Sequence, residues 1–169
     1  MSDDPDAHVP AAAPTVRAAR DEDRTRLLTI QAAAFPDPQR TLLRNAVRAG
    51  LALVAVDGPV ASGGVVAAPD PVGYALFTAD EASVYVAELA VAPGHRRRGH
   101  GGRLLAAVAA RHPDRERLRL TTRADNEAAR SFYASLGFRA VEELPGYYGD
   151  EDADGPAPAD GVLLVRDLE

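Results

Sequence analysis

The chain has 169 residues and no cysteine, and its 25 acidic residues against 19 basic ones give a net charge of −6. This length fits one domain, and the lack of cysteine excludes disulfides, thiolate zinc sites and a cysteine nucleophile. The acidic balance argues against nucleic-acid binding, which needs a basic footprint. Since no apolar run reaches about 20 residues and the N-terminus is acidic, we expect a cytoplasmic protein without membrane attachment.

All 19 basic residues are arginine. Two interpretations of this acidic, lysine-free composition stay open: adaptation to high salt, or biased genomic composition. The charge is also unevenly distributed, with nine arginines and two acids between Arg96 and Arg123, but seven acids and no arginine between Ala140 and Val165. The first segment suits a polyanion and the second suits a cation.

Residues 1–14 are rich in alanine, proline and aspartate, which predicts a disordered tail before a single domain over residues 15–169. A strand is expected at Thr15–Ala19, followed by a helix with Asp21 as its cap. A second helix, with Asp37 as its N-cap and Pro38 in its first turn, closes at Gly50. Three antiparallel strands should follow, at Leu51–Val56, Val72–Ala79 and Glu81–Ala92. Val65-Val66 could add a short strand or belong to a surface excursion.

The second half of the chain predicts two more helices and three more strands. One helix covers Gly99–His112, and the other starts at Asp125 as its cap and stops at Gly137. Spacing on this last helix places Asn126 and Tyr133 on one face, with Phe132 and Leu136 directed toward the core. The expected strands are Leu118–Thr122, Phe138–Leu144 and Val162–Leu168, with a long acidic loop over Pro145–Gly161. A mixed sheet flanked by helices results.

A strand, a glycine loop and a helix follow one another over residues 86–105. Such a junction directs unpaired backbone N–H groups and the positive end of the helix dipole toward one point, which suits a pyrophosphate. Gly99 and Gly101 would let the backbone approach phosphate oxygens. Three arginines would add positive charge at the rim, namely Arg96, Arg97 and Arg98. Taken alone, the same pattern also fits a plain loop.

The loop lacks the lysine and hydroxyl residue of a P-loop, and it does not follow the dinucleotide-binding pattern. Arg96-x-x-Gly99-x-Gly101, preceded by Leu89-Ala-Val-Ala-Pro93, instead resembles the acetyl-CoA loop of the GNAT superfamily. About thirty residues later, Asn126-x-x-Ala129-x-x-Phe132-Tyr133-x-x-Leu136-Gly137-Phe138 is similar to that family's second cofactor motif. The resemblance implies a mixed α/β fold with a mostly antiparallel sheet of about six to seven strands and about four helices.

The resemblance also implies which residues would serve acetyl-CoA. Backbone groups of Leu89, Ala90 and Val91 would hold the pantetheine and thioester, and Asn126 would bind the pantetheine or phosphate region. The loop residues Arg96, Arg97, Arg98, Gly99, His100, Gly101 and Gly102 would surround the pyrophosphate. Tyr133 would protonate the departing thiolate, since a phenol with a pKa near 10 is protonated at neutral pH. A packing role for Tyr133 is the alternative.

A substrate ammonium must lose a proton before it attacks the thioester. Glu88 is the candidate base, directly or through water, and an exposed strand carboxylate is the alternative interpretation. The chain contains no cysteine to carry an acetyl group, so we expect direct attack within a ternary complex. We expect no metal ion in the site.

The segment around Tyr147-Tyr148 resembles the protein N-terminal acetyltransferases, including the branch that acts on ribosomal proteins. Phe35, Tyr147 and Tyr148 would then contact the acceptor, which is a peptide N-terminus or a small cationic amine. Thr121 stands where those enzymes often carry a glutamate or histidine, so the role of base would pass to Glu88 or water. A non-catalytic acyl-CoA sensor is the competing hypothesis, and either a monomer or a homodimer is expected.

Overall fold

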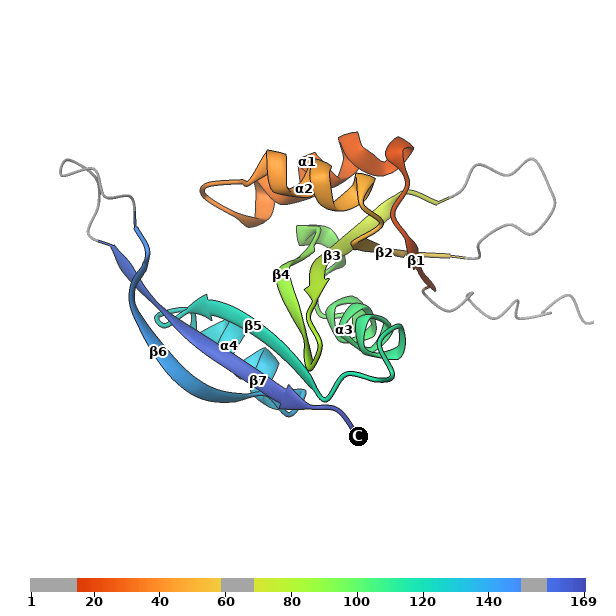
Figure 1. The fold of residues 1–169 in the computed structure, drawn as a ribbon. Helices are drawn as coiled ribbons and strands as arrows, with labels where there is room; N and C mark the ends of the chain where they lie inside the picture. Colours follow the sequence, from red (N-terminus) through yellow and green to blue (C-terminus); the bar gives the residue numbers. More distant parts are fainter. Residues whose placement is uncertain (1–14, 59–68, 150–157) are drawn as a thin grey trace, which may run out of the picture.

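The structure is a computed structural model that describes residues 15–58, 69–149 and 158–169. Within these residues one sheet has seven strands, and four α-helices flank it (Figure 1). The strands are Thr15–Ala18 (β1), Ala52–Val56 (β2), Pro71–Ala79 (β3), Ser83–Val91 (β4), Arg117–Arg123 (β5), Arg139–Tyr148 (β6) and Ala159–Asp167 (β7). The α-helices are Arg24–Ala34 (α1), Arg40–Arg48 (α2), His100–Ala110 (α3) and Glu127–Ser135 (α4), and short 3-10 turns cover Asp21–Asp23 (η1) and Pro93–His95 (η2). The predicted fold class is confirmed.

The strand order is β1-β2-β3-β4-β5-β7-β6, and every neighbouring pair is antiparallel except β4 and β5. The parallel pair is short. It joins Ser83–Val86 to Arg117–Leu120, although β4 continues to Val91 and β5 to Arg123. The remaining part of each strand diverges from the other, which is visible as the V between the two strands in Figure 1.

A bulge in β4 decides which side of the sheet its later residues face. Phe77 pairs with Val86 while Leu76 pairs with Glu88, so Ala87 is an extra residue on β4. An added residue reverses the alternation of side chains along a strand. Accordingly Val86 belongs to the core beneath α3, whereas Ala90 belongs to the core beneath α1 and α2. Glu88 thereby shares the α1 and α2 face.

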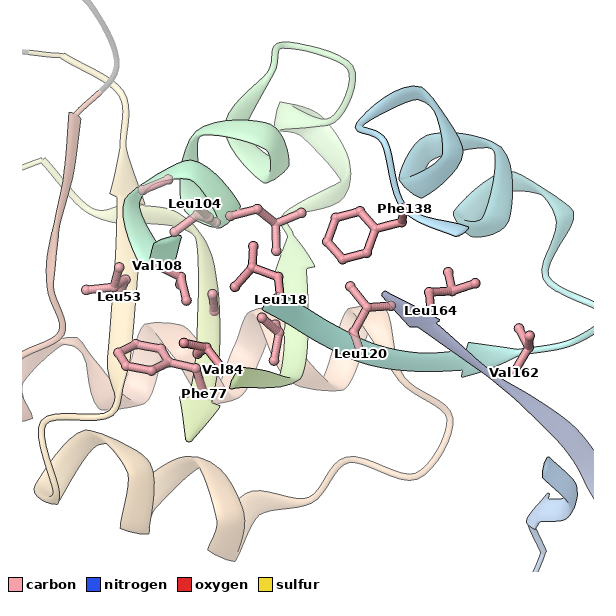
Figure 2. Packing of buried hydrophobic residues seen from close by; sticks show 14 of the residues in the cluster. Leu53, Phe77, Val84, Leu104, Val108, Leu118, Leu120, Phe138, Val162 and Leu164 are labelled. Atoms are coloured by element: carbon pink, nitrogen blue, oxygen red, sulfur yellow. The ribbon is translucent and has the colours of Figure 1, made fainter. Parts of the chain in front are cut away.

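Two apolar clusters hold the layers together. The cluster on the α1 and α2 side contains Leu27, Ile30, Leu43, Val54, Tyr74 and Leu76 among others. The cluster on the α3 side spans both halves of the sheet, as Figure 2 shows for Leu53, Phe77, Val84, Leu104, Val108, Leu118, Leu120, Phe138, Val162 and Leu164. Because burial of apolar surface contributes about 25 cal/mol per Å², this cluster is the main interaction between the β1–β4 part and the β5–β7 part of the sheet.

The helix starts differ from the predicted ones. Asp21 lies inside η1, and the carboxylate of Asp23 instead accepts the Arg20 N–H at 2.7 Å. Helix α2 begins at Arg40, with Gln39 as its N-cap, so Asp37 caps nothing. The side chain of Asn126, and not that of Asp125, caps α4. Near each helix start the sequence offers several acidic or amide residues that could cap the helix, and tertiary packing decides which of them does so.

The predicted helix ends and strands agree better with the structure than the predicted helix starts do. Gly50 and Gly137 have φ values of +73° and +86°, in the left-handed region that favours glycine at helix ends. Strand β6 runs through Tyr148, so the two tyrosines expected in a loop lie on a strand. The expected tail over residues 1–14 and the possible strand at Val65-Val66 lie outside the described residues. No helix in the described part of the chain is long and apolar enough to span a bilayer.

Candidate active site

The loop between β4 and α3 has a backbone shaped for an anion. Arg97 has φ +61° and Gly99 has φ +83°, two left-handed residues in a stretch of three. Arg97 is the one non-glycine residue with positive φ in the described residues, and such strain gathers at ligand sites. Helix α3 starts directly afterwards at His100, and the N–H groups of its first turn have no partner within the helix. Turns of this kind form anion-binding concavities.

The arginines of the loop are exposed, and two polar contacts brace it from within. Arg96 donates from Nε to the carbonyl of Val91 at 3.1 Å, which ties the loop to the end of β4. Arg103 of α3 donates from Nη1 to the carbonyl of Arg98 at 2.9 Å. Arg96, Arg97 and Arg98 are exposed on the loop, and their contact with a pyrophosphate stays a prediction.

The two loop glycines and His100 have different structural roles. A Cβ on Gly99 would meet Nη1 of Arg103 at 3.2 Å, and its positive φ disfavours any side chain. A Cβ on Gly101 would lie 2.9 Å from Cζ of Phe132, so its missing side chain makes room for an aromatic ring of α4. Phe132 therefore covers the start of α3 and stays 37% exposed, contrary to its predicted place in the core. His100 is buried at the first position of α3, so its ring is not exposed on the loop surface.

Glu88 is held by two side chains that the sequence analysis did not identify. Nε2 of Gln31 donates to both carboxylate oxygens, at 3.1 and 2.9 Å, and the Tyr74 hydroxyl donates to Oε2 at 2.8 Å. Gln31 and Tyr74 are fully buried. Burial raises the pKa of Glu88, while the hydrogen bonds from Gln31 and Tyr74 act to lower it. The interpretation as a free, exposed carboxylate is wrong.

No pattern in the chain marks Gln31 or Tyr74 as partners of Glu88, because 57 and 14 residues separate them from it. The one feature of the sequence that could have pointed to either residue is a polar group among apolar residues of a helix or strand. Gln31 lies on the stripe of Leu27 and Ile30, and Tyr74 lies in a strand of apolar residues. A polar group inside the core needs a partner, since an unpaired one costs about 1–3 kcal/mol.

Tyr133 lies two turns into α4, against the core on the α3 side. Its ring meets Phe138 edge-on at 5.6 Å between centroids and Phe132 at 5.1 Å. Burial, and to a smaller extent the nearby Tyr148, raises the pKa of Tyr133 to about 12, so the phenol keeps its proton at neutral pH. Asn126 uses its Oδ1 to accept the Ala129 N–H at 3.0 Å, which leaves its amide nitrogen and the second lone pair of Oδ1 for a ligand.

Tyr147 and Tyr148 gather with two residues from neighbouring strands. Their rings lie 4.9 Å apart, edge to face, and Cβ of Tyr147 approaches Gly161 of β7 closely. The hydroxyl of Tyr85 donates to Oγ1 of Thr121 at 3.1 Å beside them. Burial, followed by the charges of Tyr147 and Tyr85, raises the pKa of Tyr148 to about 12. Phe35, the third predicted acceptor contact, ends α1 and packs against the α1 and α2 core.

The two cofactor motifs meet where β4 and β5 diverge. Helix α3 follows β4 and helix α4 follows β5, so both helices begin beyond the carboxyl ends of the one parallel pair. Ligands of α/β sheets bind at such a point. The segment Ala87–Val91, which stays beside β3 but no longer pairs with β5, carries Glu88 and runs into the loop. Glu88 lies on β4 and Tyr133 on α4, the helix that follows β5, so the two candidate catalytic residues come from the two diverging strand–helix units.

Solved structures share this fold. Ard1 from Thermoplasma volcanium superimposes with a TM-score of 0.74 at 22% identity, covering 94% of this chain and 99% of that one. NAA60 of Arabidopsis thaliana in complex with a bisubstrate analogue gives a TM-score of 0.75 at 22% identity, with 93% and 100% covered. A GNAT family acetyltransferase from Elizabethkingia anophelis with acetyl-CoA bound gives 0.69 at 19% identity, with 92% and 98% covered.

Curated relatives are similar over a shorter segment. A mycothiol acetyltransferase of Kineococcus radiotolerans is 45% identical over 64 residues, and one of Cellulomonas flavigena is 45% identical over 80 residues. These segments cover 38% and 46% of this chain, but only 21% and 23% of the relatives, so the match spans less than a quarter of their length. The model of the acetyltransferase (GNAT) family matches residues 20–138, which include both cofactor motifs. Because that match takes in the loop before α3, the start of α4 and the strand of Glu88, the chain belongs to the GNAT acetyltransferase family, whose acetyl donor is acetyl-CoA.

Proposed function

We propose that this protein transfers the acetyl group of acetyl-CoA to a primary amine, by direct attack of the amine within a ternary complex. The observation that carries the proposal is the half-buried carboxylate of Glu88, held by the buried Gln31 and Tyr74 on the strand that leads into the loop. A carboxylate whose pKa is raised by burial accepts a proton more readily than an exposed one. The same strand has free backbone groups for the pantetheine.

In the proposed reaction Glu88 accepts a proton from the substrate ammonium, directly or through one water. The free amine then attacks the thioester carbonyl carbon, a C–N bond forms, and the C–S bond breaks to release CoA thiolate. The amine loses its second proton to solvent. Backbone N–H groups of the loop and of the first turn of α3 hold the pyrophosphate, with Arg96, Arg97 and Arg98 around it.

Tyr133 supplies a hydrogen bond to the departing sulfur. Full proton transfer from a phenol with a pKa of about 12 to a thiolate with a reference pKa of about 8.5 is uphill by about 5 kcal/mol. The hydrogen bond itself stabilises the developing negative charge, and the proton reaches the sulfur or is exchanged with solvent as CoA leaves. This role differs from simple general-acid catalysis and keeps Tyr133 protonated in the resting enzyme.

The acceptor is a cationic amine, either a peptide N-terminus or a small molecule. Tyr147 is half-exposed beside Tyr148, and an ammonium group binds such an aromatic face by cation–π attraction, as the Arg123 guanidinium does over the Tyr148 ring at 5.9 Å. The acidic residues of the same segment add negative charge, and Glu142, Glu143 and Asp160 are the described ones. Because the chain is similar to NAA60 in fold and to mycothiol acetyltransferases over a short segment, we include both acceptor classes among the compounds to be tested.

The test is a mass-spectrometric search for acetylated products with peptides, polyamines, aminoglycosides and mycothiol precursors as acceptors. Release of CoA thiol is followed in parallel, and the chain adds no background because it contains no cysteine. Glu88→Gln keeps the shape of the side chain but removes the base, so acceptor-dependent release should fall by about 10²-fold or more. Acetyl-CoA binding without release for any acceptor would favour the sensor, and acetylated enzyme trapped without acceptor would refute direct transfer.

A further inference from the structure

Three titratable side chains meet behind the cofactor loop, namely Asp57, His95 and His100. Asp57 follows β2, His95 ends η2 and His100 begins α3. Nδ1 of His95 lies 2.9 Å from Oδ2 of Asp57, and Nε2 of His100 lies 3.3 Å from its Oδ1. One possible ligand atom from each residue falls within 4.8 Å of the others. Two imidazoles thus face the two oxygens of one carboxylate.

His100 gives an independent indication that a ligand belongs here. Its side chain is fully buried, and neither ring nitrogen has a hydrogen-bond partner among the described residues. A buried nitrogen without a partner costs about 1–3 kcal/mol. A phenylalanine or leucine would fill the same space without that cost. Nε2 lies 3.3 Å from Oδ1 of Asp57 without the geometry of a hydrogen bond, so the buried ring keeps a nitrogen available for a ligand beside that carboxylate.

We propose that Asp57, His95 and His100 bind a divalent transition-metal cation, with Zn²⁺ as the best match. Zinc takes histidine nitrogen and carboxylate oxygen at about 2.0–2.2 Å in tetrahedral sites, which places neighbouring ligand atoms about 3.3 Å apart. The two histidine nitrogens lie 2.9 and 3.3 Å from different oxygens of Asp57, and one ligand atom from each of the three residues lies within 4.8 Å of the others, so small side-chain adjustments would give this spacing. Water would complete the fourth position. Two imidazoles exclude Mg²⁺ and Ca²⁺, which prefer oxygen ligands.

The surrounding charges set the limits of the site. Nη1 of Arg98 lies 3.7 Å from Oδ2 of Asp57, and Arg103 is also close enough to influence His100. Both positive groups oppose a cation. Arg98 is 59% exposed, however, so its side chain can turn into solvent when an ion takes its place beside Asp57. Substitution of Arg98 should therefore strengthen metal binding, whereas substitution of a ligand residue should weaken it.

The position of the site relates it to the cofactor loop. His95 and His100 stand at the two ends of the segment Arg96–Gly99, and Asp57 belongs to a different part of the chain. One ion would therefore join both ends of the loop to the end of β2. The site is separate from Glu88 and Tyr133, and the proposal does not depend on the identity of the acceptor.

The experiment is calorimetric titration of the metal-free full chain with ZnCl₂, with MgCl₂ as control ion and Co²⁺ absorption as a second readout. One Zn²⁺ per chain is expected, with no heat from Mg²⁺ and with visible Co²⁺ bands of a low-coordinate site. His95→Ala and Asp57→Asn should each weaken Zn²⁺ binding by more than the ~10-fold typical of losing an outer-shell partner. Arg98→Gln should tighten it.

His8→Ala is the matched control, because it removes a histidine that is remote in sequence from the cluster, and it should leave Zn²⁺ affinity unchanged. His95 and Asp57 are about one-third exposed, so their variants should stay folded, and circular dichroism checks this. Absence of Zn²⁺ binding overturns the proposal. So does binding that survives both ligand substitutions, or that disappears in His8→Ala.

Discussion

Replacement of Tyr74 by phenylalanine tests whether Glu88 is the base. The change removes one hydroxyl, which donates to Oε2 of Glu88 at 2.8 Å, and keeps the buried ring in place. Glu88 must be ionised to accept a proton, and this hydrogen bond stabilises its ionised form. Its loss raises the pKa of Glu88, so the acidic limb of the rate profile should move to higher pH.

The size of the effect follows from the strength of the bond. A hydrogen bond to a charged acceptor contributes about 1.5–3 kcal/mol, and about 1.4 kcal/mol corresponds to a factor of ten. On the acidic limb the ionised fraction of Glu88, and with it the rate, should fall by about 10- to 100-fold. Well above the limb the two proteins should differ little, because Glu88 is then ionised in both.

The assay is kcat/KM for CoA release as a function of pH, with acetyl-CoA saturating. Tyr85→Phe is the control, since it removes a hydroxyl from the same strand as Glu88 that bonds Thr121 instead. This control should leave the position of the acidic limb unchanged. If the limb of a folded Tyr74→Phe protein coincided with that of the parent, another group would control the rate and Glu88 would not be the base.

Three further predictions follow from the site and the core. Gly99→Asp adds a side chain at φ +83° and a negative charge beside the pyrophosphate, so calorimetry should show acetyl-CoA affinity at least tenfold weaker, about 1.4 kcal/mol; an unchanged dissociation constant would place the cofactor elsewhere. Tyr133→Phe keeps the packing and removes the hydrogen bond to sulfur, so kcat should fall by about 10²-fold with acetyl-CoA affinity retained, and a near-normal kcat would remove Tyr133 from the mechanism. Asp23→Ala should lower the free energy of unfolding, measured in urea, by about 3 kcal/mol. The substitution leaves Arg17 without the carboxylate whose oxygens it contacts at 2.7 and 2.8 Å. The control Asp21→Ala removes only an exposed ion pair and should have little effect. Burial acts to raise the pKa of Asp23, but its hydrogen bonds from Arg17 and Arg20 outweigh burial and lower it, so the Asp23→Ala difference should be present at neutral pH and vanish as acid protonates the carboxylate; a difference that persists in acid would contradict this account.

Local signals predicted the elements well. Alternating and helical spacing located all seven described strands and four helices, and the glycines at positions 50 and 137 marked helix ends. The two motifs also predicted that the loop before α3 and the start of α4 lie on the cofactor side, which stays a prediction. These features depend on neighbours within about one turn of helix or one strand, and such neighbours are visible in a single sequence.

The features that the sequence did not reveal depend on distant partners. The bulge at Ala87 shows no marker such as glycine, although it decides that Glu88 faces Gln31 and Tyr74. Phe132 was predicted to be buried from its helical spacing, but helix α4 lies so that this ring covers Gly101. Asp57 meets His95 only because the end of β2 lies near η2 in space. Each of these contacts is a product of topology.

The short parallel ladder between β4 and β5 has a consequence for hydrogen exchange. Four positions pair across it, and beyond Val86 the backbone N–H groups of β4 that point away from β3 face none of the strands in the described part of the chain. In the free protein these amides should exchange with deuterium faster than those of the central strands β2 and β3. A pantetheine chain laid along Ala87–Val91 would take the place of the missing strand and slow the same amides. Amide exchange with and without acetyl-CoA would therefore outline the bound cofactor residue by residue, before any acceptor is known.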